Sequence, residues 1–190
     1  MAVNDRSRLP PGQHETIRWP RLDLGVVPRH DLTQWDLTVD GAVEKPRKFS
    51  YDEILKLPPT HVVADFHCVT GWTKLNNAWD GVSIRAIGDL VKPAATARYI
   101  TFACDEGYTT SHPLEVLYDE DVLLAYRHDG EPLPAEHGGP LRLVVPKRYA
   151  WKSAKWVRRL KFTEQEELGY WEVRGYSNTA DPWTEDRYSY

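Results

Sequence analysis

The stretch Ala64-Asp65-Phe66-His67-Cys68-Val69-Thr70-Gly71-Trp72 predicts a buried strand that runs into a glycine turn, with a cysteine where the strand ends. Cysteine is scarce, because Cys68 and Cys104 are the only two among 190 residues. A thiol at a strand end, beside a histidine and a turn, can be presented to a cofactor or a metal. A free cysteine is more often a small hydrophobe in a core. The stretch by itself leaves both interpretations open.

Composition limits the classes of protein to which the chain can belong. A length of 190 residues suits one domain, and 41% hydrophobic with 27% charged residues suits a sizeable core. The net charge of −4 gives no general reason to expect nucleic acid or an anionic membrane surface. No apolar run approaches the ~18 residues of a membrane span. The start has no apolar signal region, so a cytoplasmic location is expected unless a leader was removed.

Periodicity and turn signals predict a domain rich in strands. Residues 1–27 are expected to form an extended N-terminal arm, and residues 28–190 the domain, whose aromatic tail packs on the surface or over a pocket. Ser50 and Glu53 form a capping box for a short helix, and Ser83 is a plausible N-cap for a helix over 84–91. The run Trp79-Asp80-Gly81-Val82 predicts a turn. Strands are expected at 35–39, 60–66, 98–103, 122–126, 141–145 and 156–162, which together with short helices favour a mixed α+β domain.

The segment 141–162 reverses the sign of the overall charge. It carries several lysines and arginines and no acid, so it is suited to an anion such as a phosphate, or it is a solvated basic strand and loop. The loop just before it contains His137, Gly138 and Gly139, and glycines allow a ligand to approach the backbone closely. A single loop histidine is more often a structural hydrogen-bonding group than a catalyst.

Four stretches in order resemble the sulfite-oxidase-like molybdopterin oxidoreductases. They are Phe66-His67-Cys68-Val69-Thr70-Gly71-Trp72, Trp79-Asp80-Gly81-Val82, Gly139-Pro140-Leu141-Arg142-Leu143-Val144-Val145-Pro146 and Trp151-Lys152-Ser153-Ala154-Lys155-Trp156. The resemblance extends from about residue 28 to about residue 188, nearly the whole chain. It implies a single α+β domain with the mixed-sheet, molybdopterin-binding fold of the sulfite oxidase catalytic domain.

The resemblance also implies a cofactor, Mo-molybdopterin, whose pterin ends in a phosphate or a nucleotide, and a two-electron redox reaction, oxygen-atom transfer to or from a small substrate. The metal would be bound by the two dithiolene sulfurs of one pterin and by Cys68, since a soft thiolate suits such a metal. Tyr108 resembles a tyrosine that reaches the active pocket. Electrons would pass to or from an external carrier. The residues expected to contact the cofactor are Arg29, His30, Cys68, Cys104, His137, Arg142, Lys152, Ser153 and Lys155.

The run after the cysteine departs from the family pattern. Sulfite oxidases carry arginines there, whereas this chain has Trp72 and Lys74, so sulfite, a sulfoxide or an N-oxide all stay open as substrate types. Two alternatives also stay open: a non-enzymatic binding module on the same fold, and a mononuclear zinc or copper site built from His67, Cys68 and Cys104. Adjacent residues on a strand point to opposite faces, which argues against His67 and Cys68 binding one ion.

Overall fold

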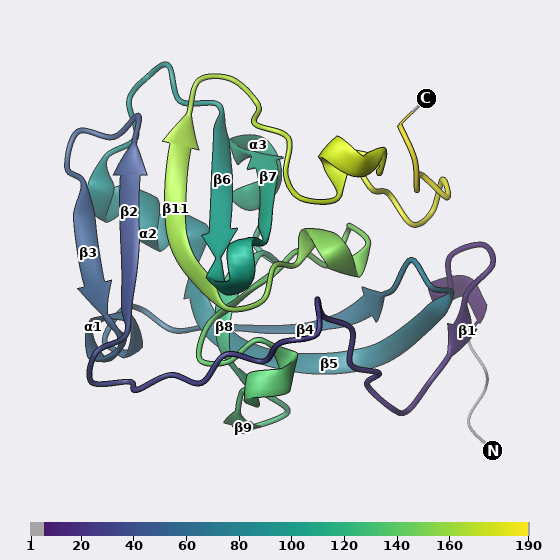
Figure 1. The fold of residues 1–190 in the computed structure, drawn as a ribbon. Helices are drawn as coiled ribbons and strands as arrows, with labels where there is room; N and C mark the ends of the chain where they lie inside the picture. Colours follow the sequence, from purple (N-terminus) through teal and green to yellow (C-terminus); the bar gives the residue numbers. More distant parts are fainter. Residues whose placement is uncertain (1–5, 190) are drawn as a thin grey trace.

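Two β-sheets form the body of the computed structural model, which describes residues 6–189 (Figure 1). The first sheet has six strands in the order β1-β5-β8-β10, with β4 paired to β5 and β9 paired to β8. Its strands are β1 (His14–Glu15), β4 (Thr60–His67), β5 (Trp72–Ser83), β8 (Leu123–His128), β9 (Glu131–Pro132) and β10 (Arg142–Val144). Only the β1–β5 pairing in this sheet is parallel, within the described residues.

The second sheet has five strands in the order β3-β2-β11-β6-β7. They are β2 (Asp36–Gly41), β3 (Arg47–Ser50), β6 (Tyr99–Cys104), β7 (Thr109–Pro113) and β11 (Val157–Thr163). Strand β2 pairs in parallel with β11, although the two are far apart in sequence, so this sheet ties the start of the domain to its end. The strand-rich α+β prediction is confirmed.

The helices are short and begin where local signals predict. Helix α1 (Tyr51–Leu55) has the predicted capping box, in which the Glu53 amide donates to Ser50 Oγ and the Ser50 amide donates back to Glu53. Helix α2 (Ile84–Val91) begins after Ser83, whose hydroxyl accepts the Ala86 amide. Helix α3 is Leu114–Leu117, and single 3-10 turns lie at Arg6–Arg8, Asp105–Gly107, Ala135–His137, Ala150–Lys152 and Glu172–Arg174. The described residues contain no helix long and apolar enough to cross a membrane.

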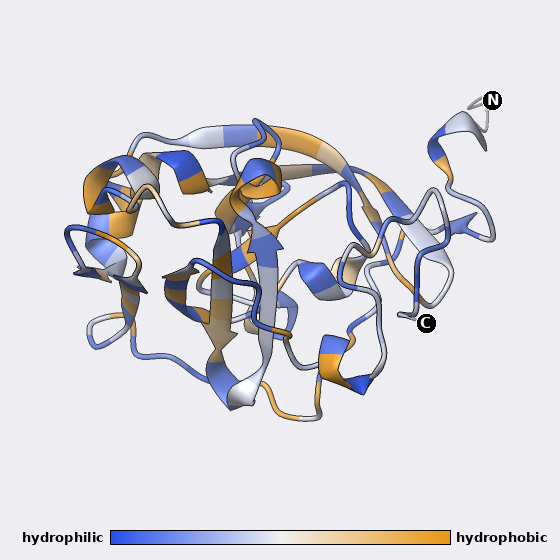
Figure 2. Ribbon diagram, turned by 90° about the horizontal axis from the view of Figure 1, so that it is seen from above, coloured by the Kyte–Doolittle hydropathy of each residue, from blue (hydrophilic) through white to orange (hydrophobic). Residues whose placement is uncertain are grey.

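The six-stranded sheet is buried on both faces along the first half of β8. Along β8, Leu124 joins the main core between the sheets, whereas its neighbours Leu123 and Ala125 join a second core on the other face. This second core contains Cys68 and four aromatic or aliphatic neighbours from β4 and β5. In Figure 2 the strands carry the broad hydrophobic stretches, and most connecting loops are hydrophilic. The cysteine that ends β4 therefore sits in an apolar layer and not at the solvent surface.

The turn predicted at Trp79-Asp80-Gly81-Val82 is wrong, because these residues lie inside β5. The pairing with β8 shifts register between Asp80 and Gly81, which marks a bulge in the strand. A Cβ on Gly81 would stand 2.0 Å from the Leu124 carbonyl oxygen. Here the glycine lets the backbones of two strands approach closely. An Asp-Gly pair in the sequence does not show whether the glycine has this role or forms a turn.

A buried ion pair fastens the C-terminal tail to the domain. Lys152 Nζ donates to Glu172 Oε1 (2.6 Å) and to the Ser111 carbonyl (2.7 Å), and both side chains are essentially inaccessible to solvent. Thr110 also donates to the same Glu172 oxygen, at 2.8 Å. The pair therefore links β7, the Ala150–Lys152 turn and the tail at one buried point.

Replacing Glu172 with glutamine should destabilise the protein strongly, since the variant leaves the buried Lys152 ammonium without a countercharge. We expect the free energy of unfolding to fall by about 3–5 kcal/mol, as measured by urea denaturation. Glu185→Gln is the matched control, because the Glu185 carboxylate is half exposed and its pair with Arg187 lies at the surface. Equal losses for the two variants would contradict the anchoring role of the buried pair.

Candidate functional site

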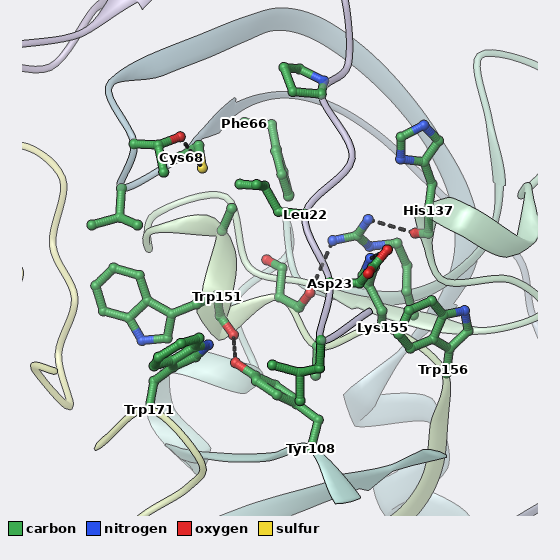
Figure 3. A pocket seen from close by; sticks show the side chains of 18 of the residues that line it. Leu22, Asp23, Phe66, Cys68, Tyr108, His137, Trp151, Lys155, Trp156 and Trp171 are labelled. Atoms are coloured by element: carbon green, nitrogen blue, oxygen red, sulfur yellow. Dashed lines mark hydrogen bonds and ion pairs between the residues drawn. The ribbon is translucent and has the colours of Figure 1, made fainter. Parts of the chain in front are cut away.

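A cavity of about 360 Å³ lies where the two sheets, the N-terminal arm and the tail meet (Figure 3). Its lining residues come from six parts of the chain, within 19–24, 66–72, 105–108, 137–142, 150–156 and 171–176. The volume falls at the lower end of the range for small-molecule and cofactor sites. Cys68, Trp151 and Trp171 lie at one end in Figure 3, whereas His137 and Lys155 lie at the other.

We call these two parts the thiol end and the basic end. The thiol end comprises Cys68, Trp151 and Trp171 together with the turn residues after Cys68, which are Val69, Thr70 and Trp72. The basic end comprises His137 and Lys155 together with Arg142, which donates to the His137 carbonyl. The cavity is therefore polar and cationic at one end and largely aromatic at the other.

A tight turn after β4 presents the Cys68 thiol. The Cys68 amide donates to the Trp72 carbonyl (2.8 Å), and Gly71, at φ 93°, donates back to the Cys68 carbonyl (3.0 Å). Gln13 Nε2 donates to the same carbonyl at 2.9 Å, so the arm also braces the turn. The Cys68 Sγ lies 3.1 Å from the Thr70 hydroxyl. Burial raises the pKa of the Cys68 thiol, and the Thr70 hydrogen bond opposes this by favouring the thiolate.

Arg142 at the start of β10 is a buried cation that no carboxylate pairs with, among the residues that the structure describes. It donates to the carbonyls of His137 (2.7 Å) and Ser153 (3.0 Å) and faces the rings of three aromatic residues. Burial lowers the pKa of Arg142 to about 9, which still leaves it charged at neutral pH. The guanidinium thus gives the cavity a fixed positive charge and joins the His137 loop to the Ser153 segment.

Lys155 and His137 complete the basic end. Burial is the main cause that lowers the pKa of Lys155 to about 8 and the pKa of His137 to about 4, and the charge of Arg142 is the second cause. His137 is therefore neutral at pH 7. Lys155 Nζ donates to the Glu136 carbonyl at 3.2 Å and lies 3.9 Å from Asp23. Gly138 allows this packing, because a Cβ there would stand 2.9 Å from the Lys155 side chain.

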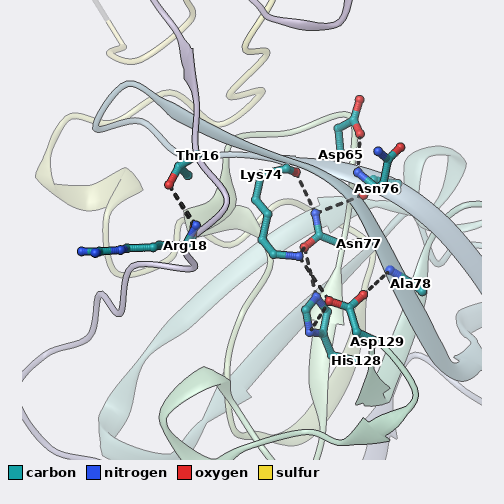
Figure 4. A network of polar contacts seen from close by, with 10 residues as sticks. Thr16, Arg18, Asp65, Lys74, Asn76, Asn77, Ala78, His128 and Asp129 are labelled. Carbon is teal, nitrogen blue, oxygen red and sulfur yellow. Dashed lines mark hydrogen bonds and ion pairs between the residues drawn. The ribbon is translucent and has the colours of Figure 1, made fainter. Parts of the chain in front are cut away.

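Trp19 from the arm connects the basic end to a second polar cluster, shown in Figure 4. Its ring stacks on His137 at 3.8 Å and lies 4.3 Å from the ring of His128. His128 in turn contacts Asn77 (3.0 Å), whose side chain also accepts from Lys74 (2.8 Å). Burial lowers the pKa of His128 to about 4, so the cluster carries no imidazolium at neutral pH.

The same cluster binds the side chain of Lys74, which is the first lysine after Cys68 in the sequence. Lys74 Nζ contacts Asn77 and Asp129, at 2.8 and 3.3 Å, and Lys74 does not line the cavity. Trp72, by contrast, lies in the cavity wall. The chain therefore brings no cation from this run to the thiol end.

An aromatic wall closes the thiol end. The Tyr108 hydroxyl donates to the Trp151 carbonyl, and Tyr176 packs edge-on against the Trp151 ring at 5.2 Å. Burial raises the pKa of Tyr108 well above its ordinary value, so this hydroxyl keeps its proton. Trp171 packs on Tyr176 at 5.1 Å, which places the tail against the cavity as expected from its aromatic content.

The structure brings six of the predicted site residues to the cavity: Cys68, Tyr108, His137, Arg142, Ser153 and Lys155. It places the other four elsewhere: Arg29, His30, Cys104 and Lys152. His30 pairs with Asp105 at 2.6 Å, Cys104 lies in the main core, and Lys152 is committed to Glu172. Contacts of these four with a cofactor stay predictions.

The basic stretch as a whole is not an open anion surface. Acids from elsewhere in the chain pair with Lys147, Arg158, Arg159 and Lys161 as well as Lys152. Only part of the charge excess therefore faces the cavity, and it comes from Arg142 and Lys155. Local composition could not reveal most of this, because Asp36, Asp40 and Asp119 are distant in sequence from the cations that they pair with.

Sequence reasoning missed the arm residues in the cavity, chiefly Trp19, Leu22 and Asp23. A tryptophan within a proline- and arginine-rich arm was a weak signal that the arm packs against the body of the domain. The structure also separates the proposed zinc or copper ligands, since His67 points to Thr73 and Trp183 and does not line the cavity. No group of three or more His, Cys, Asp or Glu suited to a metal exists among residues 6–189.

Comparison with known proteins identifies the fold and its cofactor. Residues 24–171 match the family described as the oxidoreductase molybdopterin binding domain. The chain belongs to this family. The resemblance seen in the sequence is confirmed, and the protein is a molybdopterin-dependent oxidoreductase of the sulfite-oxidase-like type, not a simple binding module.

Three similar proteins show the breadth of the family. An uncharacterized oxidoreductase, YuiH, of Bacillus subtilis is 42% identical over 184 residues, covering 96% of this chain and 93% of its own length. The protein-methionine-sulfoxide reductase catalytic subunit MsrP of Campylobacter jejuni is 27% identical, over 80% of this chain and 57% of its own. The sulfane dehydrogenase SoxCD of Paracoccus pantotrophus matches with a TM-score of 0.68 at 26% identity, covering 73% of this chain and 40% of that one.

The residues at the cavity suit Mo-molybdopterin. At one end a thiol matches a soft metal. At the other end a lysine and a buried guanidinium, which has no carboxylate partner among the described residues, match an anionic tail. Cys68 would hold the metal, and Arg142, Ser153 and Lys155 would hold the anionic part. The glycines at 138 and 139 keep the loop beside them close to its neighbours.

Cys68→Ser should abolish retention of molybdenum, because the alkoxide of serine is a far poorer soft ligand than a thiolate. We expect near-stoichiometric molybdenum in the purified wild-type protein and almost none in the variant, by mass spectrometry of the metal. Cys104→Ser is the matched control, because Cys104 lies in the main core and should leave the metal content unchanged. Unchanged molybdenum in Cys68→Ser would refute the ligand assignment.

In protein made without cofactor, Lys155 should react with acetic anhydride faster than Lys147 at pH 8. A pKa of about 8 leaves about half of the Lys155 amine neutral there, whereas Asp119 raises the pKa of Lys147. Peptide mass spectrometry measures both rates in one sample. Faster reaction at the more exposed Lys147 would contradict the electrostatics described for the basic end.

Proposed function

We propose that the protein reduces a small uncharged sulfoxide, such as the side chain of methionine sulfoxide, by oxygen-atom transfer. The observation that carries this proposal is the apolar surrounding of Cys68, which packs in one cluster with Phe66 and Trp72, while the nearby Lys74 is held by other partners. Methionine-sulfoxide reductases among the similar proteins support the same substrate class, although the chain spans little more than half of their length.

Charge decides between sulfite and a sulfoxide. A sulfite anion loses its hydration on entering a buried pocket and needs cations or several donors in return. Arg142 and Lys155 lie with His137 toward the basic end, and Lys74 is held by Asn77 and Asp129. A sulfoxide has a single polar S–O group and apolar substituents, which suit an aromatic wall.

The protein residues have separable roles in this reaction. When bound, Mo-molybdopterin supplies the centre for two-electron exchange and oxygen transfer. Cys68 would hold the metal, and the Thr70 hydroxyl, 3.1 Å from the Cys68 sulfur, would stabilise its thiolate form. Tyr108 positions Trp151 through the Trp151 carbonyl, and the tail residues Trp171 and Tyr176 exclude water from the wall.

Reduction of a sulfoxide consumes two electrons and two protons and yields a thioether and water. An external electron carrier would supply the electrons, since residues 6–189 contain no group of three or more His, Cys, Asp or Glu that could hold a separate metal ion. A cytoplasmic location, expected from the sequence, stays part of the proposal.

The test compares substrates on the molybdenum-loaded protein. With a reduced viologen as donor, we expect methionine sulfoxide to be turned over at least about tenfold faster than sulfite is oxidised with ferricyanide, a difference of ~1.4 kcal/mol. Trp171→Ala should raise KM for the sulfoxide, because it opens the wall, whereas Trp183→Ala should not, since Trp183 packs near His67 and does not line the cavity. Faster turnover of sulfite would refute the proposal.

A further inference from the structure

Part of the arm crosses the cavity with few bonds to the body of the protein. We call residues 17–30 the strap. It follows Thr16, whose amide donates to the Thr73 carbonyl at 2.9 Å, and it ends at His30, which pairs with Asp105 at 2.6 Å. Within the described chain, no backbone hydrogen bond joins residues 17–30 to the rest. Displacing the strap therefore breaks no backbone hydrogen bond to the rest of the described chain, and the main contacts to be broken are those of the Trp19 ring with His137 and Arg142.

Side chains of the strap fill space inside the cavity. Leu22 lies between the thiol end and the basic end in Figure 3, and Leu24 also lines the cavity. Both leucines are nevertheless 42–53% exposed, so they are only partly packed. Trp19 makes the firmest contact, by stacking on His137 at 3.8 Å. The strap therefore occupies the region between the thiol and the cations without a tight fit.

Asp23 brings a carboxylate to the basic end. Its side chain is 6% exposed and lies 3.9 Å from Lys155, and no other acid in the described residues pairs with that lysine. Arg21 Nε and the Gly25 amide donate to the two carboxylate oxygens, at 2.5 and 2.8 Å. Both contacts lower the pKa of Asp23, and the contact with Arg21 has the larger effect. Asp23 is therefore an anion at neutral pH.

The Asp23 carboxylate thus lies beside Lys155, one of the two cations, with Arg142, that would bind the anionic group of the cofactor. Two anions at one lysine repel each other, and only one of them can be its close partner. We propose that the strap is a gate for cofactor loading, in which Asp23 holds the anion position at Lys155 until a phosphate group displaces it. The inference rests on the cofactor of the family and not on the substrate proposed above.

The first test uses the full chain made in cells that cannot synthesise molybdopterin, with inorganic phosphate as the probe. Asp23→Asn removes the competing charge, so equilibrium dialysis should show phosphate binding about tenfold tighter than in the wild type. Glu15→Gln, an exposed acid on β1 of the same arm, is the control and should change nothing. Equal or weaker phosphate binding in Asp23→Asn would overturn the proposal, provided that circular dichroism shows both variants folded.

The second test asks where the strap lies once the cofactor is bound. Trypsin can cut after Arg18 and Arg21, both exposed on the strap, and cleavage after the exposed Arg174 gives an internal reference. A displaced strap predicts cleavage at Arg18 and Arg21 several-fold faster in molybdenum-loaded than in unloaded wild-type protein. Equal or slower cleavage in the loaded protein would mean that the strap closes over the cofactor and would overturn the gate. Neither test measures turnover, so its outcome is independent of the sulfoxide proposal.

Discussion

The buried guanidinium of Arg142 is the constraint on which the site depends. A charge in the interior costs several kcal/mol unless dipoles or an opposite charge compensate for it. Here the carbonyls of His137 and Ser153 and the faces of Trp19, Phe66 and Trp79 surround it. The same contacts hold the loop and the segment that form the basic end. The cation therefore organises the cavity and also makes it favourable for an anionic cofactor group.

A second buried charge organises the opposite side. The Lys152–Glu172 pair fixes the tail, and the tail carries Trp171 to the thiol end. Tyr108 ties Trp151 into the same wall. The cavity thus combines a cationic end with an aromatic end at which the one cavity-lining cysteine of the described chain is held. This separation of charge allows one pocket to bind an anionic cofactor tail and an uncharged substrate without either competing for the other's groups.

Local signals predicted much of this architecture. Caps at Ser50 and Ser83, the alternation along the strands and the cysteine at the end of β4 all depend on neighbours a few residues away. Long-range pairing could not be predicted in the same way. Arg158 meets Asp36 across most of the chain, so a basic run looked free although it is largely neutralised. The strap, too, owes its place to cavity contacts and not to any periodic pattern.

The central claim is that the Cys68 sulfur and a basic end bind one molybdenum cofactor between them. X-ray absorption at the molybdenum K-edge of the loaded protein tests it most directly, because the spectrum counts the sulfur atoms bound to the metal. The account predicts the two dithiolene sulfurs of a single pterin and one further sulfur at thiolate distance. A spectrum with the dithiolene sulfurs alone would contradict it, since Cys68 would then lie beside the metal without binding it.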